Sequence, residues 1–248
     1  MTTIAVAGGT GWVGRRVVES VRRLGAEPIV IARSRGVDLT TGRGLDDVLA
    51  GVDAVIDVTN IVTQNRRRAI RFFETSTRHL LEAEERHGVG HHLLLSIVGI
   101  DRVGMGYYQA KQAQEDVVRQ GQVPWTILRA TQFHDLVVAL FAVQRVTPVV
   151  LAPSFAVQPI AVDDVAGRLV ELAGSTPAGR VPDIGGPEVR RLPDLARVWQ
   201  RSVGSRRPVV PLTLPGRVFG GYAAGANLVP GVPYGRITFE EHLAAARR

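Results

Sequence analysis

The sequence predicts an α/β fold, a doubly wound parallel sheet with helices on both faces. Short apolar strands alternate with amphipathic helices over roughly the first half of the chain, the pattern of consecutive βαβ units. The first strand runs directly into a glycine-rich turn that opens a helix. The 248 residues, 45% of them apolar, are enough to form a large buried core.

Each element follows from its hydrophobic period. Apolar runs bounded by glycine, proline or charge predict buried strands, and apolar residues spaced three and four apart predict helices. The expected strands are Thr3–Ala7, Pro28–Ala32, Ala54–Val58, His92–Ile97 and Trp125–Arg129. The expected helices are Trp12–Leu24, Leu45–Leu49, Ile70–His87 and Tyr108–Gln120.

The pattern becomes less regular after residue 149. We expect a strand over Gln158–Val162, a helix that Asp163 caps and that ends at Ala173, and a helix over Leu192–Val203. Residues 208–235 are rich in glycine and proline but apolar, which indicates a lobe packed over the sheet edge. We therefore divide the chain into a nucleotide-binding core, 1–150, and a small C-terminal substrate-binding lobe, 151–248, that completes the same domain.

Composition excludes several classes of function. The chain has no cysteine, so disulfides, thiolate metal sites and cysteine nucleophiles are excluded, and we expect no metal. The net charge of +7 comes from scattered arginines, which argues against nucleic-acid binding. We find no signal peptide and no apolar run long enough to span a bilayer, so we expect a cytoplasmic protein without membrane contact.

The turn after the first strand has the spacing of a phosphate-binding loop, G-x-x-G-x-x-G. Gly8 permits the tight turn, Gly11 lets the backbone approach a pyrophosphate, and Gly14 lets the new helix lie close to the sheet. The helix N-terminus adds unpaired N–H groups and a positive dipole end. The predicted cradle consists of Gly8, Thr10, Gly11, Trp12, Val13 and Gly14.

The residues after the second strand favour NADP(H) over NAD(H). An acid at this position would bind the ribose 2′-hydroxyl of NAD, but the strand ends in Arg33, Ser34 and Arg35. An arginine pairs with a 2′-phosphate through charge-assisted hydrogen bonds. Asp38 comes later, and with Leu39 it resembles the pair of residues that contacts the adenine in related folds.

Ser96, Tyr107 and Lys111 form a candidate catalytic set. The tyrosine and the lysine are four residues apart, so they share one side of a helix start. A nearby ammonium would lower the pKa of the phenol and make it a better acid–base group, and the serine hydroxyl would polarise a substrate carbonyl. Lys111 is the only lysine in the chain, and Tyr108 lies beside Tyr107 without the required spacing.

These motifs resemble the short-chain dehydrogenase/reductase superfamily, and more closely its atypical, NmrA-like NAD(P)-binding branch. The resemblance rests on GGTGWVG at 8–14, on Ser96 with Tyr107-x-x-x-Lys111, on WTILRAT at 125–131 and on PIAVDDVA at 159–166. It implies a Rossmann fold, a nicotinamide cofactor, and hydride transfer with Tyr107 as acid–base group. Val58-Thr59-Asn60 replaces the Asn-Ala-Gly motif of the family, and Thr59 and Asn60 are candidates for the nicotinamide side.

Gln132, Phe133 and His134 follow the fifth strand and are candidates for the substrate pocket, because ligands bind outside the carboxyl ends of parallel strands. Together the signals predict an NADP(H)-dependent reductase that transfers a hydride to a carbonyl or enone of a small apolar substrate. Two alternatives stay open at this point: a non-catalytic NADP-sensing regulator, and an NAD(P)-dependent epimerase or dehydratase. The oligomeric state is not predicted.

Overall fold

The chain forms two compact units that alternate along the sequence. The computed structural model describes residues 2–246. The first unit contains the residues up to 100 together with 105–129 and 166–182. The second contains 101–104, 130–165 and the residues from 183 onward. The assignment of residues 151–248 as a substrate-binding lobe stays a prediction.

A six-stranded parallel sheet organises the first unit, as the sequence predicts. Its strands are β1 (Ile4–Ala7), β2 (Ile29–Ile31), β3 (Ala54–Asp57), β4 (His91–Ile97), β5 (Trp125–Ala130) and β8 (Gly179–Arg180). They lie in the order β2-β1-β3-β4-β5-β8. The order reverses at β1, because β2 pairs on one side of β1 and β3 on the other. In an open sheet, the crevice beyond the carboxyl ends of β1 and β3 is the place where ligands bind.

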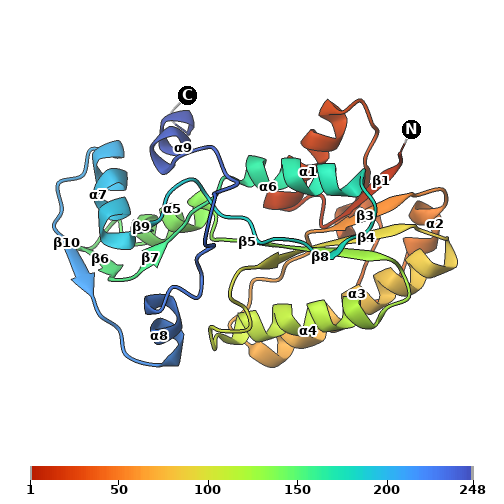
Figure 1. The fold of residues 1–248 in the computed structure, drawn as a ribbon, viewed down its shortest axis with the longest axis horizontal. Coiled ribbons are helices and arrows are strands. Elements are labelled where there is room, and N and C mark those ends of the chain that lie inside the picture. The colour runs from red at the N-terminus through yellow and green to blue at the C-terminus, as the bar shows by residue number, and fades with distance from the viewer. Residues whose placement is uncertain (1, 247–248) are drawn as a thin grey trace. The chain divides into compact units, whose positions relative to one another are not determined.

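Helices cover both faces of this sheet. They are α1 (Trp12–Arg23), α2 (Leu45–Leu49), α3 (Arg66–Arg86), α4 (Gly106–Gln120) and α6 (Val162–Ala173). Figure 1 shows α3 and α4 on one face, and α1 and α6 on the other. α3 begins earlier than the predicted Ile70, because the Asn65 side chain accepts a hydrogen bond from the Arg68 amide and caps the helix.

Short strands and helices form the second unit. They are α5 (His134–Ala142), β6 (Val150–Pro153), β7 (Ala156–Val157), β9 (Arg190–Arg191), α7 (Leu192–Ser202), β10 (Val209–Leu212), α8 (Arg217–Ala223) and α9 (Phe239–Ala245). β6 and β10 form a parallel pair, and β7 and β9 an antiparallel pair. A core that includes Phe141, Trp199 and Phe239 holds α5, α7 and α9 together.

Two expectations in this region are wrong. The predicted strand Gln158–Val162 is an extended segment in which Ile160 forms one bridge to Phe133, because Pro159 lacks an N–H donor and α6 already begins at Val162. Asp163 therefore lies in the first turn of α6, two residues after the cap position at residue 161. Its neighbour Asp164 accepts a hydrogen bond from the backbone N–H of Arg236 at 3.0 Å.

We expect two glycine-to-alanine substitutions to change the free energy of unfolding in opposite directions. A Cβ at Gly14 would lie 2.1 Å from the Gly8 carbonyl oxygen, so Gly14→Ala should lower the free energy of unfolding by about 2–3 kcal/mol. Gly167 on α6 faces open space, so Gly167→Ala should raise it by about 0.5–1 kcal/mol. Urea unfolding followed by circular dichroism measures both, and equal effects of the two substitutions would contradict the predicted close packing.

Candidate functional site

The glycine turn after β1 has the geometry that its spacing predicts. Gly8 has a φ of +78°, a conformation that L side chains rarely adopt. A Cβ at Gly14 would overlap the backbone of Gly8 and lie 2.7 Å from the Gly9 Cα. The missing side chains thus let α1 begin directly on the turn.

The N-terminus of α1 is open toward a ligand. Within residues 2–246 no side chain caps this helix, and its first turn contains no acid. A Cβ built at Gly11 would meet only the Gly8 carbonyl oxygen, at 3.0 Å, so the outer side of Gly11 is clear. Unpaired backbone N–H groups at a positive dipole end suit a pyrophosphate, and the residues of the predicted cradle fit a dinucleotide.

The end of β3 lies against this turn. A Cβ at Gly8 would approach the Thr59 Cα and the Val58 carbonyl oxygen to 3.1 Å. Asn60 follows, and its side-chain oxygen accepts a hydrogen bond from the Tyr107 hydroxyl at 2.7 Å. The structure therefore connects the predicted acid–base residue to the glycine turn through consecutive residues of the β3 end.

The two neighbouring tyrosines have different environments. Tyr108 is 4% exposed and belongs to the core of the unit. Tyr107 is half-buried and directs its hydroxyl to Asn60. Of the two phenols, Tyr107 is the one available to a ligand.

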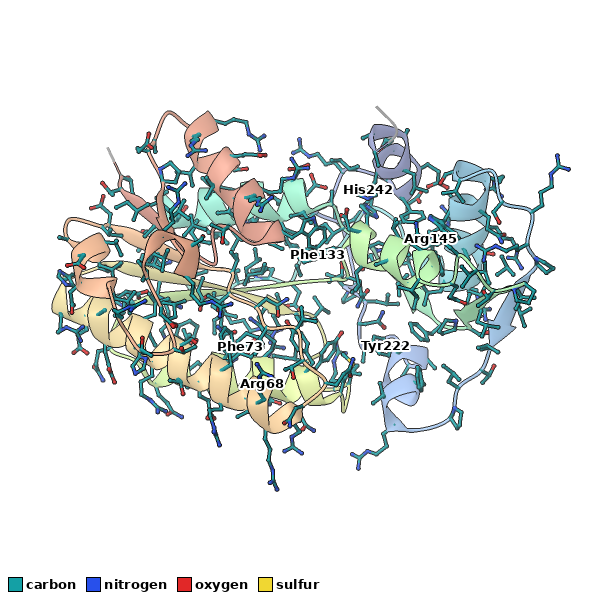
Figure 2. All side chains as sticks on the ribbon, turned by 180° about the vertical axis from the view of Figure 1, so that it is seen from behind. Arg68, Phe73, Phe133, Arg145, Tyr222 and His242 are labelled. Carbon is teal, nitrogen blue, oxygen red and sulfur yellow. The ribbon has the colours of Figure 1, made fainter. Side chains whose placement is uncertain are left out.

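Burial raises the pKa of Tyr107 to about 12, the opposite of the shift that a neighbouring ammonium would cause. The Phe73 ring is part of this buried environment and contacts both the Tyr107 ring and the Lys111 ammonium. It packs edge-on against the Tyr107 ring, with 6.0 Å between the ring centroids, and its centroid lies 5.0 Å from the Lys111 Nζ. Figure 2 shows Phe73 on the inner side of α3, toward the sheet.

Lys111 points into the core instead of toward the phenol. Its Nζ donates to the Leu95 carbonyl oxygen at 2.8 Å and to the Gln114 side-chain oxygen at 2.5 Å. The Gln114 amide nitrogen donates in turn to Asp57 at 2.9 Å, and Asp57 accepts the backbone N–H of Thr59 at 2.8 Å. Burial lowers the pKa of Lys111 to about 8, although Asp57 opposes the shift.

Ser96 is also enclosed, at 3% exposure. It lies beside the carboxylate of Glu115, which pairs with Arg129 through two hydrogen bonds of 2.8 Å. Burial alone would raise the pKa of Glu115, but the hydrogen bonds and the charge of Arg129 hold it below its usual value. The structure thus keeps Ser96 and Lys111 inside the unit and Tyr107 at its open side, and the catalytic role of the set stays a prediction.

Arg33, Ser34 and Arg35 form an exposed 3-10 turn after β2. Hydrogen bonds from the Thr40 side chain and backbone lower the pKa of Asp38, and the charge of Arg33 adds to the effect. In the described part of the chain, neither Arg33 nor Arg35 forms an ion pair. Two arginines are therefore free to meet an anionic group.

The three predicted pocket residues belong to the second unit. His134 is 1% exposed, bonds the Ile237 carbonyl oxygen at 2.9 Å and stacks on His242. Phe133 is half-buried and pairs with Ile160 in an isolated bridge. The side-chain amide of Gln132 is buried without a hydrogen-bond partner among residues 2–246. Their role toward a substrate stays a prediction.

Asp57, Phe73 and Gln114 are site residues that the sequence reasoning missed. Asp57 carried a signal, since a single charge ends an otherwise apolar strand. Gln114 stands three residues after Lys111 and so shares its helix face. Among the described residues, no group of three or more His, Asp or Glu side chains could hold a metal, and no helix is long and apolar enough to cross a membrane.

Comparison with known proteins gives the family. A family model described as NAD(P)H-binding matches residues 8–175. The chain belongs to this NAD(P)H-binding family. The match confirms the NAD(P)-binding family that the sequence resemblance implies.

Two curated relatives resemble this member of the family. A ceramide reductase of Caulobacter vibrioides is 26% identical over 199 residues, which cover 72% of this chain and 63% of the relative. A chloroplastic divinyl chlorophyllide a 8-vinyl-reductase of Oryza sativa subsp. indica is 26% identical over 222 residues, which cover 75% of this chain and 55% of the relative. The chain spans less than two thirds of the length of either relative.

Solved structures share the fold. An NADPH-dependent quinone oxidoreductase of Escherichia coli in complex with NADPH has a TM-score of 0.78 at 17% identity, covering 99% of this chain and 100% of the other. A UDP-glucose 4-epimerase of Thermotoga maritima has a TM-score of 0.77 at 16% identity, covering 98% and 96%. At these identities, the likeness supports the fold alone.

We expect Gly11→Val to abolish dinucleotide binding without unfolding the protein. The valine side chain would fill the clear side of the turn, where the pyrophosphate approaches. Fluorescence titration with NADPH measures binding, and circular dichroism checks the fold. Binding equal to that of the parent protein would show that the turn does not hold the cofactor.

Lys111 should give stability a specific pH dependence. Its pKa falls from 10.5 to about 8 on folding, so between these values the unfolded chain holds a proton that the folded chain lacks. Stability should therefore rise with pH across this window, and the penalty below it is about 3 kcal/mol. Lys111→Met removes the titrating group and keeps Tyr107, so the difference between parent and variant isolates the lysine. A difference that stays flat from pH 8 to pH 10.5 would contradict the burial of this ammonium.

Proposed function

We propose that the protein is an NADP(H)-dependent reductase that transfers a hydride to a carbonyl or enone carbon of a small apolar substrate. The observation that carries this proposal is the connection from the Tyr107 hydroxyl through Asn60 to the β3 end beside Gly8. This connection supports a role of Tyr107 as proton donor beside the residues that would hold the nicotinamide half of a dinucleotide. The two reductases among the relatives support the same class of reaction.

The environment of Tyr107 favours reduction over oxidation. When bound, NADPH would supply the hydride that adds to the substrate carbon, and the cofactor would be left as NADP⁺. The Tyr107 O–H bond breaks as its proton goes to the substrate oxygen, and the phenolate regains a proton from water. Burial raises the pKa of Tyr107 to about 12, so the residue is a phenol at neutral pH, the form that donates a proton in reduction, and the phenolate that oxidation needs is disfavoured.

The chain's other residues position this donor and the cofactor. Asn60 accepts the Tyr107 hydrogen bond and fixes the direction of the hydroxyl. The Lys111–Gln114–Asp57 chain of hydrogen bonds holds the backbone of Thr59, so Lys111 acts as a positioning residue. Arg33 and Arg35 would pair with the 2′-phosphate of NADP(H).

A non-catalytic NADP-sensing regulator of the NmrA-like type is the second candidate. The position of Lys111 favours it, because the ammonium is bonded to Leu95 and Gln114 and does not lower the pKa of Tyr107. An epimerase would use the cofactor and return it unchanged. Net consumption of NADPH separates the reductase from both alternatives.

We expect NADPH to bind at least about tenfold more tightly than NADH, since an ion pair to the extra phosphate contributes roughly 1.5–3 kcal/mol. The double variant Arg33→Ser with Arg35→Ser should remove this preference and leave NADH affinity unchanged. Arg22→Ser, at an exposed position on α1, is the control. Fluorescence titration of both cofactors measures the ratio, and an equal affinity in the parent protein would refute the NADP(H) preference.

Tyr107→Phe should lower turnover by about 10²–10⁴-fold with little change in NADPH affinity, because it removes the proton donor and keeps the ring against Phe73. Tyr108→Phe is the matched control and should keep turnover near that of the parent. The assay follows NADPH oxidation with a panel of quinones, enones and aromatic ketones. Full turnover by Tyr107→Phe would contradict the assignment, and no oxidation with any panel member would favour the regulator.

A further inference from the structure

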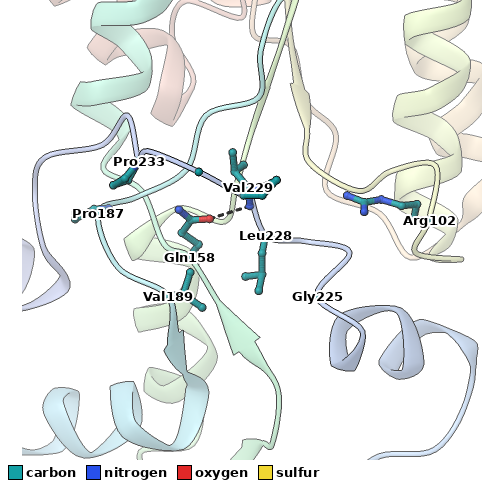
Figure 3. A pocket seen from close by; sticks show the side chains of 10 residues that line it. Arg102, Gln158, Pro187, Val189, Gly225, Leu228, Val229 and Pro233 are labelled. Atoms are coloured by element: carbon teal, nitrogen blue, oxygen red, sulfur yellow. Dashed lines mark hydrogen bonds between the residues drawn. The ribbon is translucent and has the colours of Figure 1, made fainter.

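The second unit contains a pocket of about 510 Å³ that is lined by none of the residues assigned to the proposed reduction. This volume suits a ligand of small-molecule size. The lining residues, drawn in Figure 3, come from the loop after β4, from the segments flanking β7 and β9, and from the chain between α8 and α9. Its walls are mainly proline, valine and leucine side chains, including Pro187, Val189, Leu228 and Val229.

Gln158 holds two walls of this pocket together. Its side-chain oxygen accepts the Val229 backbone N–H at 2.9 Å, as Figure 3 shows. Its amide nitrogen donates to the Gly186 carbonyl oxygen at 3.0 Å, next to Pro187. Gln158 is 3% exposed, so its amide is engaged in shaping the pocket and does not serve as a contact for a ligand.

Arg102 supplies the charge of the pocket. Its guanidinium donates to the Ala226 carbonyl oxygen at 2.8 Å and, among residues 2–246, forms no ion pair. Figure 3 shows it pointing toward the wall of Leu228 and Val229. Guanidinium N–H groups therefore remain available at the edge of an apolar cavity.

We propose that this pocket binds an apolar carboxylate, with the carboxylate at Arg102 and the apolar body against the proline, valine and leucine walls. The planar fork of an arginine matches a carboxylate, which accepts two parallel hydrogen bonds. The single positive charge among the lining residues balances one negative charge, which fits a carboxylate better than a phosphate dianion. The proposal goes beyond the reductase function and does not depend on it.

Isothermal titration calorimetry tests the proposal by measuring the affinity of the full chain for phenylbutyrate, phenylbutanamide and phenylpropylphosphonate. Phenylbutyrate should bind at least about tenfold more tightly than its neutral amide. Arg102→Met should weaken the binding of phenylbutyrate to the level of the amide and leave the affinity for the amide unchanged. Arg206→Met, an exposed arginine of the same unit outside the pocket, should change neither.

Val189→Asp provides a second variant in case Arg102→Met does not fold. Val189 is 52% exposed, so the substitution should leave the fold intact, and its negative charge should weaken phenylbutyrate more than the amide. Equal affinities for carboxylate and amide, tighter binding of the phosphonate, no binding up to about 10 mM, or indifference to both variants would each overturn the proposal. NADPH oxidation by the same samples, followed with the panel of quinones, enones and aromatic ketones, tests the reductase function separately.

Discussion

The close approach of the backbone at Gly8, Gly14 and Thr59 is the constraint on which the rest of the first unit depends. A Cβ at Gly14 would lie 2.1 Å from a backbone oxygen, and one at Gly8 would lie 3.1 Å from the Thr59 Cα. Only glycine leaves room for α1 to begin on the turn while the β3 end passes beside it. Since Asn60 follows Thr59, the same contact determines where the Tyr107 hydroxyl finds its partner.

Buried charges fix the rotation of α4 about its axis. Lys111 bonds the Leu95 carbonyl oxygen of β4, and Glu115, on the same helix, pairs with Arg129 of β5. Removing such groups from water is unfavourable, and the lowered pKa of Lys111 reflects that penalty. The network fixes the orientation of the helix: with α4 held in this rotation, Tyr108 enters the core, and Tyr107 stays half-buried with its hydroxyl at Asn60. Stability and the geometry of the site therefore oppose each other at Lys111.

The sequence predicts the first five strands and the helices between them because each has a clear period and a glycine or proline at its boundary. It does not predict α5, whose residues 134–142 are apolar on nearly every side, or β7 to β9, which are two residues long. The spacing of Tyr107 and Lys111 also leaves their orientation open. Phe73, distant in sequence, contacts both side chains, and the buried Gln114 on the next turn of α4 binds the ammonium.

A crystal structure of the protein with NADPH tests the central claim most directly. We predict pyrophosphate oxygens within hydrogen-bond distance of the backbone N–H groups at the start of α1, and the nicotinamide ribose beside Asn60 and Tyr107. A dinucleotide bound away from the turn at Gly8–Gly14, or a nicotinamide that does not approach Tyr107, would contradict the account.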